Sequence, residues 1–129
     1  MNSFFSTGTL SVQDILETSN DETLVAAAKT GEHQAFSELW NRHSKKTFST
    51  MYRITRNRQD AEDALQDAFL KAYVHLKNFD GRSSFSTWLT RIAINSALMI
   101  LRRKIISAEL MAIRVSHVEK DDLPSKFFK

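Results

Sequence analysis

A row of polar and basic side chains between residues 85 and 104 has the chemistry needed to read a nucleic acid. At steps of three and four residues, which share one helix face, the sequence carries Thr87, Arg91, Asn95, Leu98 and Arg102. The amide of Asn95 can donate and accept hydrogen bonds and can discriminate base edges, whereas arginines mostly hold phosphates. The pattern predicts that Asn95 reads a base while Arg91 and Arg102 contact the backbone. The basic end of this segment adds Arg103, as a further phosphate contact or as a solvated helix end favoured by the helix dipole.

A loop directly upstream of this row adds hydrogen-bond donors and an aromatic ring. Residues 78–84 are the strongest loop signal in the chain. A loop at a helix N-terminus can hold an unstacked base between an aromatic wall and donors to the base edge. In the alternative reading, Asp80-Gly81 is an ordinary turn and Phe79 closes the core. The candidate DNA-binding residues of the loop are Phe79, Asp80, Gly81, Arg82, Ser83 and Ser84.

A stripe of acidic residues favours a basic protein partner. Asp60, Asp63, Gln66 and Asp67 follow at i, i+3, i+6 and i+7, which is one helix face. Their carboxylates could form charge-assisted hydrogen bonds with arginines of another helix. Support of the helix dipole is the alternative, but it explains carboxylates of a first turn and not Asp67. A hard cation at the three aspartates would need further oxygen ligands, which no loop supplies.

The remaining chemistry can largely be excluded. The four histidines are isolated, cysteine is absent, and three scattered glycines cannot form a phosphate-binding loop. We therefore expect no enzymatic activity, no metal and no cofactor. The 129-residue chain is 42% hydrophobic and 26% charged, with a net charge of +3, as in an ordinary one-domain globular protein. No apolar run is long enough to span a membrane, so we expect a soluble, cytoplasmic protein without membrane insertion.

The pattern of apolar residues predicts an all-α fold, a compact bundle of about four helices. The expected helices cover about residues 20–30, 32–56, 60–77 and 85–104, and Ser83 or Ser84 is the expected N-cap of the last. Residues 1–19 are expected to be a flexible leader, 20–107 the helical domain, and 108–129 a helical extension with a frayed tail. The third helix should bury Ala61, Ala64, Leu65, Ala68, Phe69, Ala72, Tyr73 and Leu76. The fourth should bury Phe85, Trp88, Leu89, Ile92, Ala93, Ser96 and Ile100.

The order DAEDALQDAFLKAYVHLKNFDGRSSFSTWLTRIAIN resembles region 2 of bacterial RNA polymerase sigma factors of the extracytoplasmic-function group, and GEHQAFSELWNRH resembles the first helices of that region. The resemblance covers about residues 21–105. It implies recognition of the promoter −10 element, with a base of the non-template strand flipped into the loop and Asn95 contacting the same element. It also implies docking on the clamp helices of the largest polymerase subunit. Under this resemblance the polymerase-binding residues are Asp60, Asp63, Gln66, Asp67, Phe69, Leu70 and Tyr73.

The chain departs from the family pattern in two places. Met99 stands where family members commonly carry a polar residue, and nothing after residue 105 resembles the second, helix-turn-helix domain (region 4) that reads the −35 element. The chain is then either a fragment or a natural one-domain form. An alternative function is a truncated interaction module that binds core polymerase or an anti-sigma factor without initiating transcription. An anti-sigma factor is an expected partner in either case. Two further alternatives are disfavoured. A metal-dependent enzyme would need metal ligands that converge on one point, and a protein that reads double-stranded DNA would need the short spacing of a helix-turn-helix; the sequence has neither.

Overall fold

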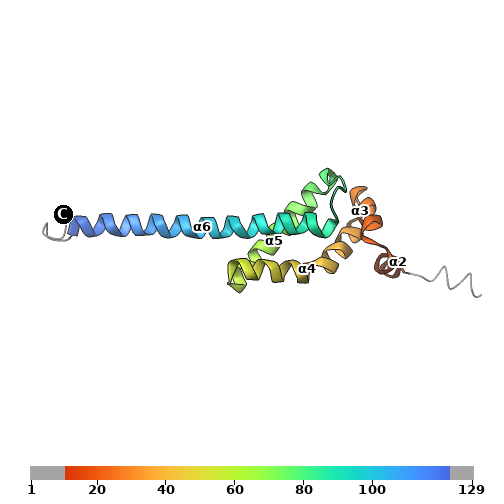
Figure 1. The fold of residues 1–129 in the computed structure, drawn as a ribbon, viewed down its shortest axis with the longest axis horizontal. Helices are drawn as coiled ribbons and strands as arrows, with labels where there is room; N and C mark the ends of the chain where they lie inside the picture. Colours follow the sequence, from red (N-terminus) through yellow and green to blue (C-terminus); the bar gives the residue numbers. More distant parts are fainter. Residues whose placement is uncertain (1–10, 123–129) are drawn as a thin grey trace, which may run out of the picture.

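The computed structural model describes residues 11–122, with side chains to residue 116, and these residues form helices joined by short connections (Figure 1). The elements are α2 (Val12–Thr18), α3 (Asp21–Lys29), α4 (His33–Thr55), α5 (Arg58–His75), the 3-10 turn η1 (Leu76–Asn78) and α6 (Phe85–Asp122). The all-α prediction is confirmed. Helices α4, α5 and α6 pack against one another, and α3 covers one end of α4.

Alanines form the contact face of α5. Ala61, Ala64, Ala68 and Ala72 are fully buried, which matches the predicted stripe. Because alanine is small, the backbone of α5 can approach its two neighbours closely, since interaxial distance depends on the side chains at the contact. Toward the middle of α6 the partners of these alanines are Met51, Ala93 and Ala97. Toward the start of α6 the core is built from Leu24, Val25, Phe36, Phe79, Phe85 and Leu89.

Capping residues explain where the helices begin. The Asn57 side chain accepts a hydrogen bond from the Asp60 N–H at 2.9 Å, so α5 starts before the predicted residue 60. The Ser84 hydroxyl accepts from the Thr87 N–H at 3.1 Å, which confirms one of the two predicted caps of α6. Helix α2 lies within the segment predicted to be a flexible leader, and its seven residues bury no side chain. The pair Ser11 and Asp14, three residues apart, was the sequence signal that could have predicted the start of α2. In the structure the two residues form reciprocal hydrogen bonds that cap the helix.

Arg42 on α4 ties the N-terminal helices to the bundle. Its guanidinium donates to Asp21 at 3.1 Å, to Glu38 at 2.9 Å and to the carbonyl of Leu16 at 2.8 Å. The hydrogen bond to Glu38 raises the pKa of Arg42, against the effect of burial, and the bond to Asp21 adds to the rise. Because Asp21 begins α3 and Leu16 lies near the end of α2, this one side chain fixes both helices on α4.

Helix α6 continues well past the bundle. It runs unbroken for 38 residues to Asp122, through most of the segment 108–129 where a helical extension was expected, and Figure 1 shows its second half extending away from the other helices. Up to residue 116, the last with a described side chain, six large apolar side chains are exposed there: Ile105, Ile106, Leu110, Met111, Ile113 and Val115. Within residues 11–122, no helix is long and apolar enough to cross a membrane. The remaining parts of the predicted leader and tail, 1–10 and 123–129, lie outside the described residues.

Candidate nucleic-acid and protein interfaces

The predicted reading row lies on the exposed side of α6. Arg91, Asn95 and Arg102 are all exposed, while Leu89, Ala93 and Ser96 on the opposite side are buried. The first half of α6 therefore has the exposed polar face and the buried apolar face that the sequence predicted. Thr87 and Leu98 extend the same exposed row. The amide of Asn95 thus stands between two guanidinium groups on a surface that a nucleic acid can reach.

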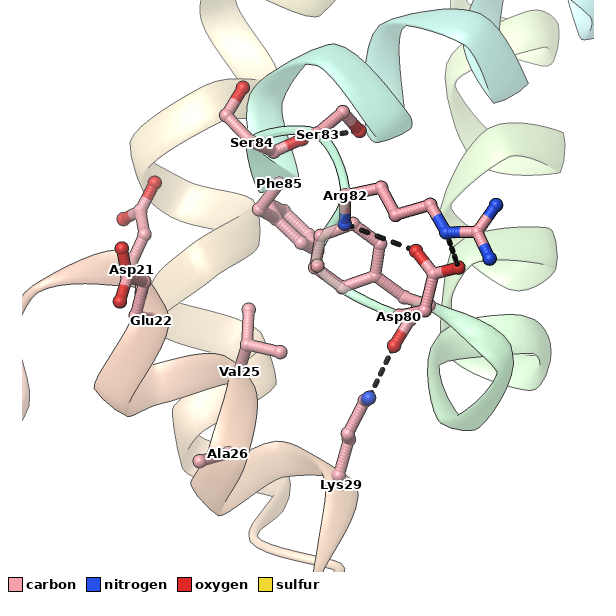
Figure 2. A pocket seen from close by; sticks show the side chains of 12 residues that line it. Asp21, Glu22, Val25, Ala26, Lys29, Asp80, Arg82, Ser83, Ser84 and Phe85 are labelled. Atoms are coloured by element: carbon pink, nitrogen blue, oxygen red, sulfur yellow. Dashed lines mark hydrogen bonds and ion pairs between the residues drawn. The ribbon is translucent and has the colours of Figure 1, made fainter.

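An open cleft lies beside the start of α6, between the loop and α3 (Figure 2). Its volume is about 680 Å³, and all six predicted loop residues line it. The opposite side of the cleft belongs to α3, whose residues were not among the predicted site residues. The residues contributed by α3 are Asp21, Glu22, Val25, Ala26 and Lys29. No sequence pattern would have found them, because α3 lies some fifty residues before the loop.

The loop itself is a turn held by local contacts between Asp80 and Arg82. The Asp80 carboxylate accepts a hydrogen bond from the Arg82 N–H at 3.1 Å and forms an ion pair with Arg82 Nε at 3.0 Å. Gly81 between them has φ +79°, which favours glycine. Asp80-Gly81 is thus a turn, as the alternative reading stated. The Arg82 side chain is 90% exposed, so it remains accessible to a ligand from solvent.

Phe79 is part of the hydrophobic core. Only 6% of the residue is exposed, and its ring lies 5.0 Å from the ring of Trp88 and 6.2 Å from that of Phe85, between centroids. Its carbonyl oxygen accepts a hydrogen bond from Lys29 Nζ, and the same ammonium lies 5.8 Å from the ring centroid. The ring can form the floor of the cleft, but it is not a free stacking platform.

The acidic stripe of α5 borders a groove between α5 and α6. The groove has a volume of about 490 Å³ and is lined by Asp63, Gln66, Asp67, Leu70, Ser96, Ile100, Arg103 and Lys104. Lys104 Nζ donates to Asp60 at 2.6 Å, and the Asp60 side chain is only 14% exposed. The carboxylate of Asp60 is therefore already paired with a lysine of the same domain, whereas the side chain of Asp63 is exposed. Arg103, predicted to bind DNA, lines this groove rather than standing in the row of Asn95.

Asp67 is partly engaged by neighbours as well. Burial alone would raise the pKa of its carboxyl, but a hydrogen bond from Lys71 at 2.8 Å and the charge of Arg103 lower the pKa below its ordinary value. The Ser96 hydroxyl also favours the carboxylate form, although it makes no hydrogen bond of normal geometry. Asp67 therefore stays charged at neutral pH and presents a side chain that is 42% exposed.

The predicted polymerase-binding residues of α5 with large apolar or aromatic side chains differ in their exposure to solvent. Leu70 is 61% exposed, whereas Phe69 is half-buried against Trp40 and Phe36. The prediction that Tyr73 is buried is wrong, since it is 44% exposed and its hydroxyl is hydrogen-bonded to His33 Nδ1 at 2.7 Å. The neighbouring core positions are taken by Ala72 and Leu76, which leaves Tyr73 on the rim. Val74 on the same helix is also exposed, but it was not among the predicted polymerase-binding residues.

Among the described residues, no three histidine or acidic side chains are grouped so that they could hold a metal ion. Of the three aspartates that were considered and disfavoured as a cation site, Asp60 is paired with Lys104 and Asp67 with Lys71.

Comparisons with known proteins point to one family. Residues 39–105 match sigma-70 region 2. The chain is 38% identical over 80 residues to the ECF RNA polymerase sigma factor SigW of Bacillus subtilis, covering 62% of this chain and 43% of that protein. It is 37% identical over 102 residues to the ECF RNA polymerase sigma-E factor of Escherichia coli K12, covering 77% of this chain and 53% of that protein. The chain therefore spans about half the length of these relatives.

A solved structure shares the fold. It is an NMR structure of an engineered region 2 of sigmaE in complex with GTAAAA. The TM-score is 0.63 at 37% sequence identity, and the match covers 74% of this chain and 94% of that one.

Proposed function

The chain belongs to the sigma-70 region 2 family, and from this premise we propose that it recognises a promoter −10 element as the region 2 domain of an extracytoplasmic-function sigma factor. The observation that carries the proposal is the exposed row of Arg91, Asn95 and Arg102 beside an open cleft. The similar domain in complex with GTAAAA supports it, because it shows that this fold can hold such a sequence.

The proposed mechanism uses binding energy to trap a melted strand. The arginines of the row hold phosphates, and the amide of Asn95 contacts a base edge. One unstacked base of the non-template strand enters the cleft, where the loop offers Arg82 and the hydroxyls of Ser83 and Ser84. Unpaired DNA is favoured over duplex because no unpairing energy has to be supplied.

We also propose that α5 docks on core RNA polymerase through the clamp helices of the largest subunit. The surface consists of Asp63, Gln66, Asp67, Leu70 and Tyr73, all at least partly exposed. Carboxylates flanked by exposed apolar side chains suit a basic helix, with charged pairs for specificity and apolar contacts for affinity. Asp60 and Phe69 support this surface from inside the domain.

Binding to single-stranded and duplex DNA of equal length tests the reading function. We expect measurable affinity for a −10 non-template strand and much weaker affinity for the duplex, measured by fluorescence anisotropy at one salt concentration. Equal affinity for the two, or tighter binding to the duplex, would contradict strand capture.

Asn95 is expected to carry sequence discrimination. Asn95→Ala should weaken binding to the preferred −10 strand by about 1–3 kcal/mol and binding to a scrambled strand much less. Arg102→Ala is the matched control on the same row, because loss of a phosphate contact should weaken both strands alike and reduce the salt slope by about one unit. If Asn95→Ala leaves both affinities untouched, this face of α6 is not the reader.

An interaction module that binds polymerase or an anti-sigma factor without initiating transcription is the second candidate. The exposed apolar side chains of α6 after residue 104 favour it, because large apolar patches often mark protein interfaces. The DNA measurements separate the two, since a pure interaction module shows no preference among strands.

A further inference from the structure

Helix α3 forms one wall of the cleft, and a lysine at its end is bonded to the loop on the other side. Lys29 lies in the last turn of α3, and its ammonium donates to the carbonyl oxygen of Phe79, fifty residues along the chain. Figure 2 shows this bond crossing from α3 to the loop. The aliphatic stem brings the charge to 5.8 Å from the centroid of the Phe79 ring, which adds a cation–π attraction.

The other hydrogen bonds of the loop are local. The Arg82 N–H donates to Asp80, the Ser83 hydroxyl donates to the Ser84 carbonyl, and Ser84 caps the helix that follows. These bonds set the shape of the turn but do not fix its distance from α3, which depends on the packing of the Phe79 ring in the core and on the Lys29 bond. The Lys29 bond acts where the loop begins, at the residue whose N–H closes η1 on the Leu76 carbonyl.

We propose that Lys29 is a positioning residue that holds the loop at the distance from α3 needed to capture an unstacked base, so that α3 is part of the DNA reader. This inference rests on the proposed strand capture. Without the tether, the loop keeps its turn but samples wider separations from α3, and the energy gained on base insertion falls because the loop must first be ordered.

The test compares strands with and without the captured base. Each position of the preferred −10 strand is replaced in turn by an abasic site, and the position with the largest loss of affinity in the wild-type protein marks the captured base. We expect Lys29→Met to reduce the intact-to-abasic affinity ratio at that position about tenfold. Lys29→Arg, which keeps the charge and the donors, should restore most of the ratio. Lys45→Met, an exposed lysine of α4 away from the cleft, should leave the ratio unchanged.

Two further readouts separate positioning from other roles. Amide hydrogen exchange of Phe79 and Arg82, whose N–H groups are hydrogen-bonded, should be faster in free Lys29→Met than in the wild type, with the melting temperature nearly unchanged. An unchanged ratio in Lys29→Met overturns the inference alone. An equal loss on intact and abasic strands, with a smaller salt slope, makes Lys29 a phosphate contact and also overturns it. If no position is sensitive in the wild-type protein, the proposed base capture itself fails.

Discussion

Replacing Phe79 with alanine is expected to lower the free energy of unfolding by about 3–5 kcal/mol, the usual cost of removing a buried aromatic side chain. Phe79 is 6% exposed and packs edge-on or tilted against Phe85 and Trp88, so the substitution leaves a cavity at the junction of the loop, α3 and α6. Chemical denaturation followed by circular dichroism measures the change. For a domain of this size the melting temperature should fall by more than ten degrees.

The matched comparison is Phe79→Leu, which keeps most of the apolar volume and should cost much less stability. DNA binding is then measured on Phe79→Leu, which remains folded. A small stability change in Phe79→Ala, with loss of affinity only for the strand that carries the captured base, would show that the ring acts as a pocket wall and not as core.

Reversing two charges on α5 is expected to abolish most of the binding to core polymerase. Asp63→Lys together with Asp67→Lys should weaken binding by about 2–5 kcal/mol if the pairs with clamp-helix arginines are desolvated, because the new ammonium groups repel those arginines. In the free domain Asp63 is exposed, whereas Asp67 is already bonded to Lys71. Asp63 should therefore account for more of the loss when each is changed alone. Co-purification and titration with core enzyme provide the measurement.

A double variant with the same change in charge controls for net charge. Glu17→Lys with Glu22→Lys alters exposed carboxylates on α2 and α3, outside both the proposed surface on α5 and the distal part of α6. It should bind polymerase nearly as the wild type does. Equal losses in the two double variants would indicate a long-range charge effect, and no loss in either would remove α5 from the interface. Raising the salt concentration should weaken the complex more than it weakens folding.

Local periodicity was sufficient to predict α3, α4, α5 and the first half of α6 with most of their faces, whereas α2 was missed. The buried positions Phe85, Leu89, Ala93 and Ser96 and the exposed Arg91–Asn95–Arg102 row follow from 3.6 residues per turn, and Ser84 was recognisable as a cap. Residues near one another on a helix are near in sequence, so their relative placement needs no knowledge of the rest of the fold. The family resemblance, confirmed by the match over residues 39–105, added the expected partners.

Contacts between distant segments were decided by the tertiary structure alone. Lys29 meets Phe79 at a separation of 50 residues, and Lys104 meets Asp60 at a separation of 44. Both pairings depend on the angle and depth at which helices cross, which the shapes of many side chains set together. Periodicity identifies which side of a helix is apolar, but it does not identify the partner. For that reason the sequence by itself located a DNA-reading row and an acidic face, whereas only the packed helices determined that Phe79 is core, that Asp60 is engaged internally, and that α3 completes the cleft.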